Sequence, residues 1–139
     1  MLTNAMLIAI NHELPQADTS ELATAWWDPG TGRVHLVGEI DFSNARRIFD
    51  AVERGADLRT DLSVDLTRLE FLDCSALHFI SELADKLHAE RRRLLLLFPR
   101  RIVQRALEVT YLARHPGLTL RNAASAGGVT SNGEWVRLA

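Results

Sequence analysis

The sequence predicts an α/β fold with a mainly parallel, mixed sheet of four to five strands and helices packed against it. Segments with the two-residue alternation of strands and segments with the 3.6-residue spacing of helices follow one another along the chain. Strands that alternate with helices need crossover connections, which make neighbouring strands parallel. The first two strands are instead joined by a short turn, which predicts one antiparallel pair at the start of the sheet.

Length and composition indicate a single folded domain. A chain of 139 residues is long enough for one hydrophobic core and too short for a second core of ordinary size. With 47% hydrophobic and 24% charged residues, the composition matches globular proteins and excludes disordered and fibrous classes. We expect an N-terminal extension over residues 1–21, a folded domain over 22–121 and a C-terminal tail over 122–139. The extension could contain one edge strand of the sheet.

Charge and cysteine content exclude several classes of function. Sixteen Lys and Arg residues against eighteen Asp and Glu give a net charge of -2, without the basic excess typical of nucleic-acid-binding proteins. No apolar run approaches the roughly 20 residues of a membrane-spanning helix, and no basic stretch precedes the first apolar residues as in a secretory signal. Cys74 is the only cysteine, and the histidines are not spaced as metal ligands. The sequence therefore predicts a soluble cytoplasmic protein without a bound metal or cofactor.

The start of the domain is predicted to form a β-hairpin. Leu22–Trp27 and Arg33–Ile40 flank the turn 28–32, where Pro and Gly supply the backbone angles that a tight turn needs. Trp26 and Trp27 are expected to pack or to cover an edge of the sheet, and not to stack on a ligand. Because they fall on opposite faces of the first strand, one ring could be exposed and mark a dimer or partner surface. Formation of a homodimer stays open at this point.

A helix is predicted to follow the hairpin and to end at Gly55, a residue that suits a helix C-terminus. Ser43 is a favourable N-cap for this helix, because its hydroxyl can accept a hydrogen bond from a free backbone N–H. The apolar residues that follow have the spacing of one helical face: Ala45, Ile48, Phe49 and Val52.

The second half of the domain alternates strands and helices. Leu62–Leu66 has apolar side chains on one face and polar ones on the other. The segment from Ser75 to about Ala89 is the most clearly amphipathic helix of the chain. The apolar run Leu94–Phe98, stopped by a proline, predicts a central strand covered on both faces. A third helix over 101–113 and a short strand over 118–120 complete the pattern.

Two motifs resemble those of the STAS family, which comprises domains of sulphate transporters and anti-sigma factor antagonists. In that family a Gly-Glu-(Leu/Ile)-Asp segment closes the second strand, and Gly38–Asp41 has this sequence here. An Asp-Ser-Ser-Gly-like segment starts the helix after the third strand, where this chain has Asp73–Ala76. The resemblance covers roughly residues 22–121 and implies a STAS-like fold. It also implies that Ser75 occupies the position that a partner kinase phosphorylates in the antagonist proteins.

The sequence departs from the family pattern at two positions. Cys74 replaces the first of the two hydroxyl residues, and Ala76 replaces the usual glycine. The hydroxyl of Ser75 is retained. Alanine removes an easily adopted backbone conformation and is expected to add a methyl group at the surface that a kinase approaches.

The resemblance implies an anti-sigma factor antagonist of the bacterial cytoplasm, a protein that regulates transcription through its partner. That partner is expected to be an anti-sigma factor serine kinase, which binds the ATP itself, and phosphorylation of Ser75 is expected to end the complex. Loops after the carboxyl ends of parallel strands share one edge of a sheet, so the segments at Asp41 and Ser75 should lie close together. The predicted partner-binding residues are Asp41, Ser43, Asp73, Cys74, Ser75 and Ala76.

Other interpretations remain open. The domain could serve as a scaffold subunit of a larger signalling or transport assembly, in which Ser75 is never phosphorylated. An enzyme would use Ser75 as nucleophile and His78 as base, but the Gly-x-Ser-x-Gly elbow of such enzymes is absent. Without the resemblance, Ser75 would be an ordinary helix N-cap and Asp73 a turn residue. Cys74 is interpreted as a small buried apolar residue in preference to a redox switch.

Overall fold

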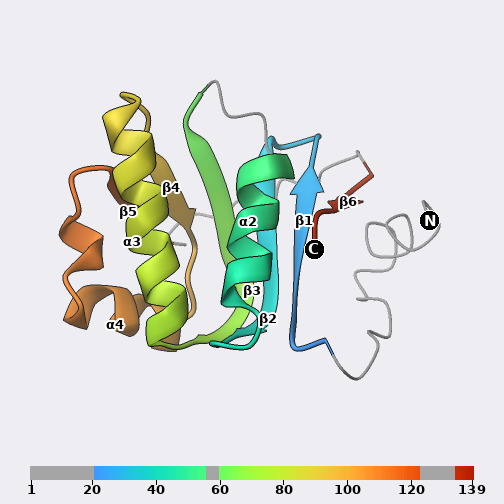
Figure 1. Cartoon of the computed structure of the whole chain (residues 1–139), viewed down its shortest axis with the longest axis horizontal. Coiled ribbons are helices and arrows are strands. Elements are labelled where there is room, and N and C mark those ends of the chain that lie inside the picture. The colour runs from blue at the N-terminus through green and yellow to red at the C-terminus, as the bar shows by residue number, and fades with distance from the viewer. Residues whose placement is uncertain (1–20, 56–59, 123–133) are drawn as a thin grey trace.

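The computed structural model describes residues 21–55, 60–122 and 134–139 and shows one sheet with helices packed on it (Figure 1). The strands are β1 (Ala23–Asp28), β2 (Arg33–Ile40), β3 (Leu62–Leu72), β4 (Leu94–Leu97), β5 (Leu118–Arg121) and β6 (Val136–Arg137). The helices are α2 (Ala45–Gly55), α3 (Cys74–Ala89) and α4 (Arg101–Val109), followed by the 3-10 helix η1 (Leu112–Arg114). The α/β class is confirmed. The part of the N-terminal extension in which an edge strand was considered, residues 1–20, lies outside the described residues.

The strands are ordered β5-β4-β3-β2-β1-β6 across the sheet. Strands β2 to β5 pair in parallel with their neighbours, whereas β1 pairs antiparallel with β2 on one side and with β6 on the other. The mainly parallel sheet with an initial hairpin is therefore confirmed. The described residues contain six strands instead of four to five, because the two residues of β6 are too few to show an alternating pattern in the sequence.

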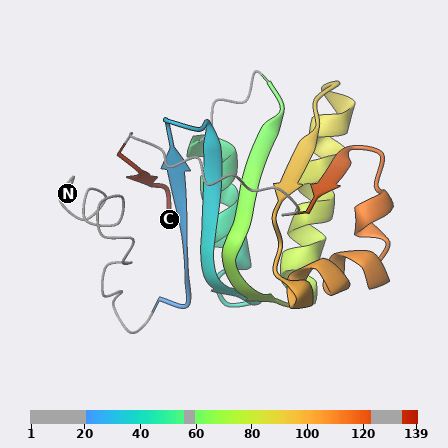
Figure 2. The same ribbon diagram turned by 180° about the vertical axis from the view of Figure 1, so that it is seen from behind.

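Helices α2 and α3 cover one face of the sheet (Figure 1). Seen from behind, β1, β2 and β3 lie in front of both helices (Figure 2). We call the face of the sheet that is turned away from α2 and α3 the open face. The hydrophobic core lies between the sheet and the two helices, where burial of apolar side chains supplies most of the stability of the fold. Its largest fully buried side chains include Leu36, Ile40, Ile48, Leu62, Leu66, Leu69, Ile80, Leu87, Leu94 and Leu96.

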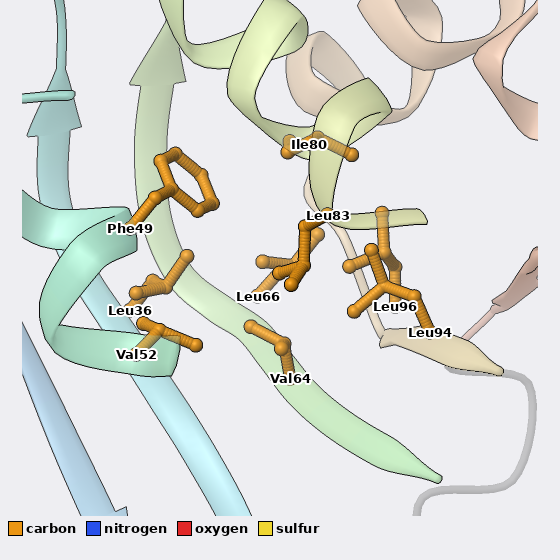
Figure 3. Close-up of a pocket in the computed structure, with 9 residues that line it drawn as sticks. All are labelled: Leu36, Phe49, Val52, Val64, Leu66, Ile80, Leu83, Leu94 and Leu96. Atoms are coloured by element: carbon orange, nitrogen blue, oxygen red, sulfur yellow. The ribbon is translucent and has the colours of Figure 1, made fainter. Parts of the chain in front are cut away.

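A narrow gap remains in the middle of the core (Figure 3). It leaves about 10 Å³ for the centre of a water-sized sphere, which is at the lower limit for a single water molecule. A buried water also needs polar partners, and every residue that lines the gap is apolar. The gap is therefore a packing defect of the core and not a ligand pocket. Its lining comprises Leu36, Phe49, Val52, Val64, Leu66, Ile80, Leu83, Leu94 and Leu96.

Strand β3 is longer than the alternation of its side chains predicts. Its pairing with β2 shifts in register twice, between His35 and Val37 and between Gly38 and Glu39, and at each shift β3 carries one extra residue. Extra residues of this kind interrupt the alternation of faces. The core-facing side chains in the second half of β3 are consequently three residues apart, at Leu66, Leu69 and Leu72. The strand predicted from the sequence ended at Leu66, because the alternation stops there.

Gly38 lets β2 pass close to the chain that precedes β1. Its φ of 96° is a backbone conformation that side chains rarely adopt. A Cβ atom at this position would lie 2.1 Å from the carbonyl oxygen of Leu22. The same carbonyl oxygen accepts a hydrogen bond of 2.9 Å from the backbone N–H of Glu39. The glycine of the Gly-Glu-Ile-Asp motif is therefore required by a close backbone approach.

Helix α4 ends at Val109, four residues before the predicted end at 113. Tyr111 has a φ of 62°, which no α-helix can accommodate, and the chain continues as the 3-10 helix η1. Leu112 in η1 is buried, so the apolar spacing of the sequence extends past the true end of the helix. The prediction of a helix to 113 was wrong for this reason.

The two tryptophans of β1 lie on opposite faces of the sheet, as predicted, but neither ring is freely exposed. Trp26 is 2% exposed and packs with Val37 and Trp135 on the open face. Trp27 is half-buried and packs against the main core. Both rings pack, as expected, and neither is free to mark a dimer or partner surface.

Candidate partner-binding site

The candidate site lies where two adjacent parallel strands end. Asp41 directly follows β2, and Asp73 is the single residue between β3 and α3. The backbone N–H of Asp73 donates a hydrogen bond of 3.1 Å to the carbonyl of Ile40, which ties the two strand ends together. The segments that carry Asp41 and Ser75 are thus neighbours in space, at the ends of β2 and β3 in Figure 1.

Asp73 connects the two segments through both oxygens of its carboxylate. Oδ1 accepts hydrogen bonds from the backbone N–H groups of Ser75 (2.8 Å) and Ala76 (3.2 Å) in the first turn of α3. Oδ2 accepts a hydrogen bond of 3.1 Å from the backbone N–H of Phe42 in the neighbouring loop. Asp73 is therefore the N-cap of α3. The alternative in which Ser75 is the N-cap is wrong, because Ser75 is the second residue of the helix.

The loop after β2 is closed by its own side chains. The backbone N–H and the hydroxyl of Ser43 both donate to Asp41 Oδ1, at 2.9 and 2.5 Å. Asn44 Oδ1 accepts from the backbone N–H of Asp41 at 2.9 Å, and Asn44 Nδ2 donates to the carbonyl of Glu39 at 3.0 Å. Helix α2 begins only at Ala45. The expectation that Ser43 caps this helix is wrong, since its hydroxyl is bound to Asp41.

Asp41 carries a negative charge at the surface of the site. The hydrogen bond from the Ser43 hydroxyl, with a smaller contribution from the Ser43 backbone N–H, lowers the pKa of the Asp41 carboxyl below its ordinary value. Together with the carboxylate of Asp73, this makes the surface around Ser75 acidic. A partner that docks here should therefore present basic groups.

The structure places the six predicted contact residues at different depths. Ser43 and Cys74 are exposed, whereas Asp41, Asp73 and Ser75 are half-buried. Ala76 is 0% exposed and belongs to the hydrophobic core beneath α3. The expectation that its methyl group lies at the surface approached by a kinase is wrong, because this position faces inward. Likewise, Cys74 is a free, exposed thiol and not the buried apolar residue that we expected.

Phe42 is a residue of this site that the sequence analysis missed. Its side chain is 81% exposed, although it is aromatic and lies between the two polar residues that close the loop. The only signal in the sequence is an aromatic residue inside a polar loop between a strand and a helix. Such a residue is ambiguous in a sequence, because a loop phenylalanine is as easily buried as exposed.

The reading of Ser75 and His78 as a catalytic pair gains no support from the geometry. His78 Nε2 lies 3.2 Å from Glu82 Oε2, and both side chains are mostly exposed. No hydrogen bond joins His78 to Ser75 among residues 21–55, 60–122 and 134–139. Within the same ranges, no three His, Cys, Asp or Glu side chains gather as a metal site requires.

Loss of the Asp73 carboxylate should destabilise the fold by about 1–2 kcal/mol, the usual range for removal of an N-cap. The expected effect of Asp73→Ala is a lower free energy of unfolding in urea titrations, because three backbone N–H groups lose their acceptor. Asp73→Asn is the matched control, since its amide oxygen still caps α3 and should preserve most of the stability. Equal unfolding free energies for the alanine variant and the wild type would contradict the assigned role.

A second polar cluster is buried on the open face of the sheet. Asp28, His35 and Asp65 come from three neighbouring strands and are all buried. His35 Nε2 lies 3.5 Å from Asp28 Oδ2, and His35 Nδ1 lies 3.9 Å from Asp65 Oδ2. The indole of Trp135 stacks on the His35 ring with centroids 4.0 Å apart. The cluster could not be predicted from the sequence, because its members come together only when three strands pair.

His35 should make the stability of the protein depend on pH. Burial lowers its pKa below 6.5, outweighing the opposing attraction of Asp65 and Asp28, and nearby Arg68 acts in the same direction as burial. The unfolded chain therefore binds a proton near pH 6.5 that the folded protein does not, so the free energy of unfolding should fall as the pH drops from 8 towards 5. We expect His35→Gln to reduce this slope in urea titrations at several pH values, whereas His88→Gln at an exposed site should leave it unchanged. Identical slopes for wild type and His35→Gln would rule out this origin.

The fold and the site define a class of protein: an α/β domain in which two parallel strand ends and one helix N-terminus form a small polar surface. A model of the STAS domain matches residues 27–125, which is more than half of the chain. The chain belongs to the STAS domain family. This confirms the resemblance that Gly38–Asp41 and Asp73–Ala76 indicated.

Comparison with solved structures finds two proteins similar to this chain. One is described as a "putative anti-sigma factor antagonist" from Thermotoga maritima; it is 19% identical, with a TM-score of 0.54 over 66% of this chain and 80% of that one. The other is the anti-sigma factor antagonist SpoIIAA in its unphosphorylated form, 25% identical with a TM-score of 0.49 over 63% of this chain and 76% of that one. A search of curated protein sequences gives no match. In the part of the chain that the structure describes, no helix is both long and apolar enough to cross a bilayer.

Proposed function

We propose that this protein is an anti-sigma factor antagonist of the bacterial cytoplasm. It binds an anti-sigma factor serine kinase, which brings the ATP, and thereby frees a sigma factor for transcription. Phosphorylation of Ser75 by that kinase ends the complex. Membership of the STAS family supports the proposal, since the family comprises antagonists of this kind alongside transporter domains.

The position of Ser75 in the first turn of α3 is the observation that carries the proposal. Backbone N–H groups at a helix N-terminus favour negative charge, so a phosphate can be tolerated there by the folded protein. The same phosphate adds close to two negative charges beside the carboxylates of Asp41 and Asp73. The phosphate would repel these two carboxylates within the site, and its bulk would displace a partner that had docked on this surface.

The buried position of Ala76 removes one objection to phosphorylation. A methyl group at the surface would narrow the approach to Ser75, but the Ala76 side chain lies in the core. The Ala76 methyl group therefore does not narrow the approach to Ser75.

The proposal is tested by incubating the protein with its purified anti-sigma kinase and ATP and measuring the intact mass. The expected result is one added phosphate, mapped to Ser75 and absent from Ser75→Ala. Ser81→Ala is the matched control, because it removes another hydroxyl of the same helix outside the predicted partner-binding residues and should still accept the phosphate. A complex that persists with Ser75 unmodified in the presence of ATP would instead support the scaffold alternative.

A further inference from the structure

Phe42 has the most exposed large apolar side chain in the described part of the chain, at 81%. A single exposed phenylalanine is not unusual on a protein surface, so its exposure alone indicates little. Its location is informative. Phe42 stands between Asp41 and Ser43 and is hydrogen-bonded through its backbone to Asp73, the residue that caps the helix of Ser75.

The backbone around Phe42 is fixed by hydrogen bonds on both sides. The Phe42 N–H is held by Asp73 Oδ2 at 3.1 Å, and the next N–H, that of Ser43, is held by Asp41 Oδ1 at 2.9 Å. Asn44 closes the loop from its other end through its contacts with Asp41 and Glu39. An aromatic side chain on a fixed backbone loses little conformational freedom when it is buried in an interface. Aromatic residues, phenylalanine among them, are enriched in the buried core of protein interfaces.

We propose that Phe42 is the aromatic anchor of the interface with the anti-sigma kinase and fills an apolar pocket on that partner. This inference rests on the proposed function. The carboxylates of Asp41 and Asp73 flank the anchor, so the pocket is expected to be rimmed by basic side chains. The low pKa of Asp41 keeps one of these carboxylates ionised well below neutral pH.

The position of Asp73 links the anchor to the phosphorylation site. One carboxylate oxygen holds the loop of Phe42, and the other holds the helical turn that contains Ser75. A phosphate on Ser75 places new negative charge two residues from this carboxylate and competes for the same N–H groups. Phosphorylation would therefore shift the position of the Phe42 side chain, in addition to its effect on the contact between Ser75 and the partner.

The test is the dissociation constant of the full-length protein, measured by titration calorimetry against the ADP-loaded anti-sigma serine kinases encoded in its own genome. Phe42→Ala should weaken binding at least about tenfold, because anchor residues of this type carry a large share of the binding energy. Val136→Ala, which shortens an exposed apolar side chain on the edge strand β6, should stay within about twofold of the wild type. Phe42→Trp should restore most of the affinity.

Asp73→Asn distinguishes the two roles of Asp73, which holds the backbone of Phe42 and caps helix α3. The asparagine oxygen can still cap α3, but Asp73 Oδ2, which accepts from the Phe42 N–H, is lost. We expect weaker binding, with most of the stability of the fold preserved. If the wild type binds a kinase and the dissociation constant of Phe42→Ala stays within twofold of it, Phe42 is not the anchor and the proposed function still stands. Absence of wild-type binding to every such kinase would overturn the proposed function and the anchor with it.

Discussion

Gly38→Ala should lower the free energy of unfolding by about 1.5–4.5 kcal/mol, the sum of two costs. The φ of 96° costs about 1–3 kcal/mol for a residue with a side chain. The new Cβ would also lie 2.1 Å from the Leu22 carbonyl oxygen, so the hydrogen bond from Glu39 to that oxygen must break, at about 0.5–1.5 kcal/mol. Urea unfolding followed by circular dichroism measures the sum.

Gly32→Ala is the matched control for this prediction. Gly32 also has a positive φ, of 68°, but no atom lies within 4 Å of the Cβ that alanine would add. This variant should therefore show only the conformational cost of about 1 kcal/mol. If both variants lost the same stability, the close backbone approach at Leu22 would not be the reason for the glycine in the Gly-Glu-Ile-Asp motif.

Ser75→Asp should weaken binding to the anti-sigma kinase by about a hundredfold, because the new carboxylate repels those of Asp41 and Asp73 and displaces the loop and helix start that the partner contacts. The fold should not suffer, because an acidic residue in the first turn of a helix interacts favourably with the helix dipole. Calorimetric titration of the kinase measures the change in the dissociation constant, and a thermal melt checks the fold.

Ser75→Asn separates charge from shape in this experiment. It has nearly the same size as the aspartate variant but no charge, and it should retain most of the affinity of the wild type. An asparagine variant that binds as weakly as the aspartate variant would show that bulk, and not charge, controls the complex. A fully active aspartate variant would remove phosphorylation as the switch and favour the scaffold interpretation.

The sequence predicted the fold best where one periodic pattern lasts for several turns or several residue pairs. Helix α3 and strand β2 are of this kind, because each buries one face against the core along its whole length. The predictions failed where tertiary contacts override the pattern. The register shifts in β3 hide its second half, the turn at Tyr111 shortens α4, and β6 becomes a strand only through its pairing with β1.

The site was predictable only as far as its motifs reach. Asp73 and Ser75 could be placed at the start of a helix, because an acidic or hydroxyl residue before an amphipathic stretch is a strong local signal. The exposure of Phe42 and the burial of Ala76 depend on which way a side chain points after the sheet has formed. The sequence also could not show that Trp135, from the end of the chain, covers His35.

Phosphopeptide mapping of the protein from its own cells can show whether Ser75 is the switched residue of a partner-binding surface. The kinase-bound and free pools would be separated by affinity purification of the kinase before digestion. We expect a free pool that carries a single phosphate on Ser75 and a kinase-bound pool that carries none. A kinase-bound pool phosphorylated on Ser75, or a free pool with Ser75 unmodified, would contradict this expectation.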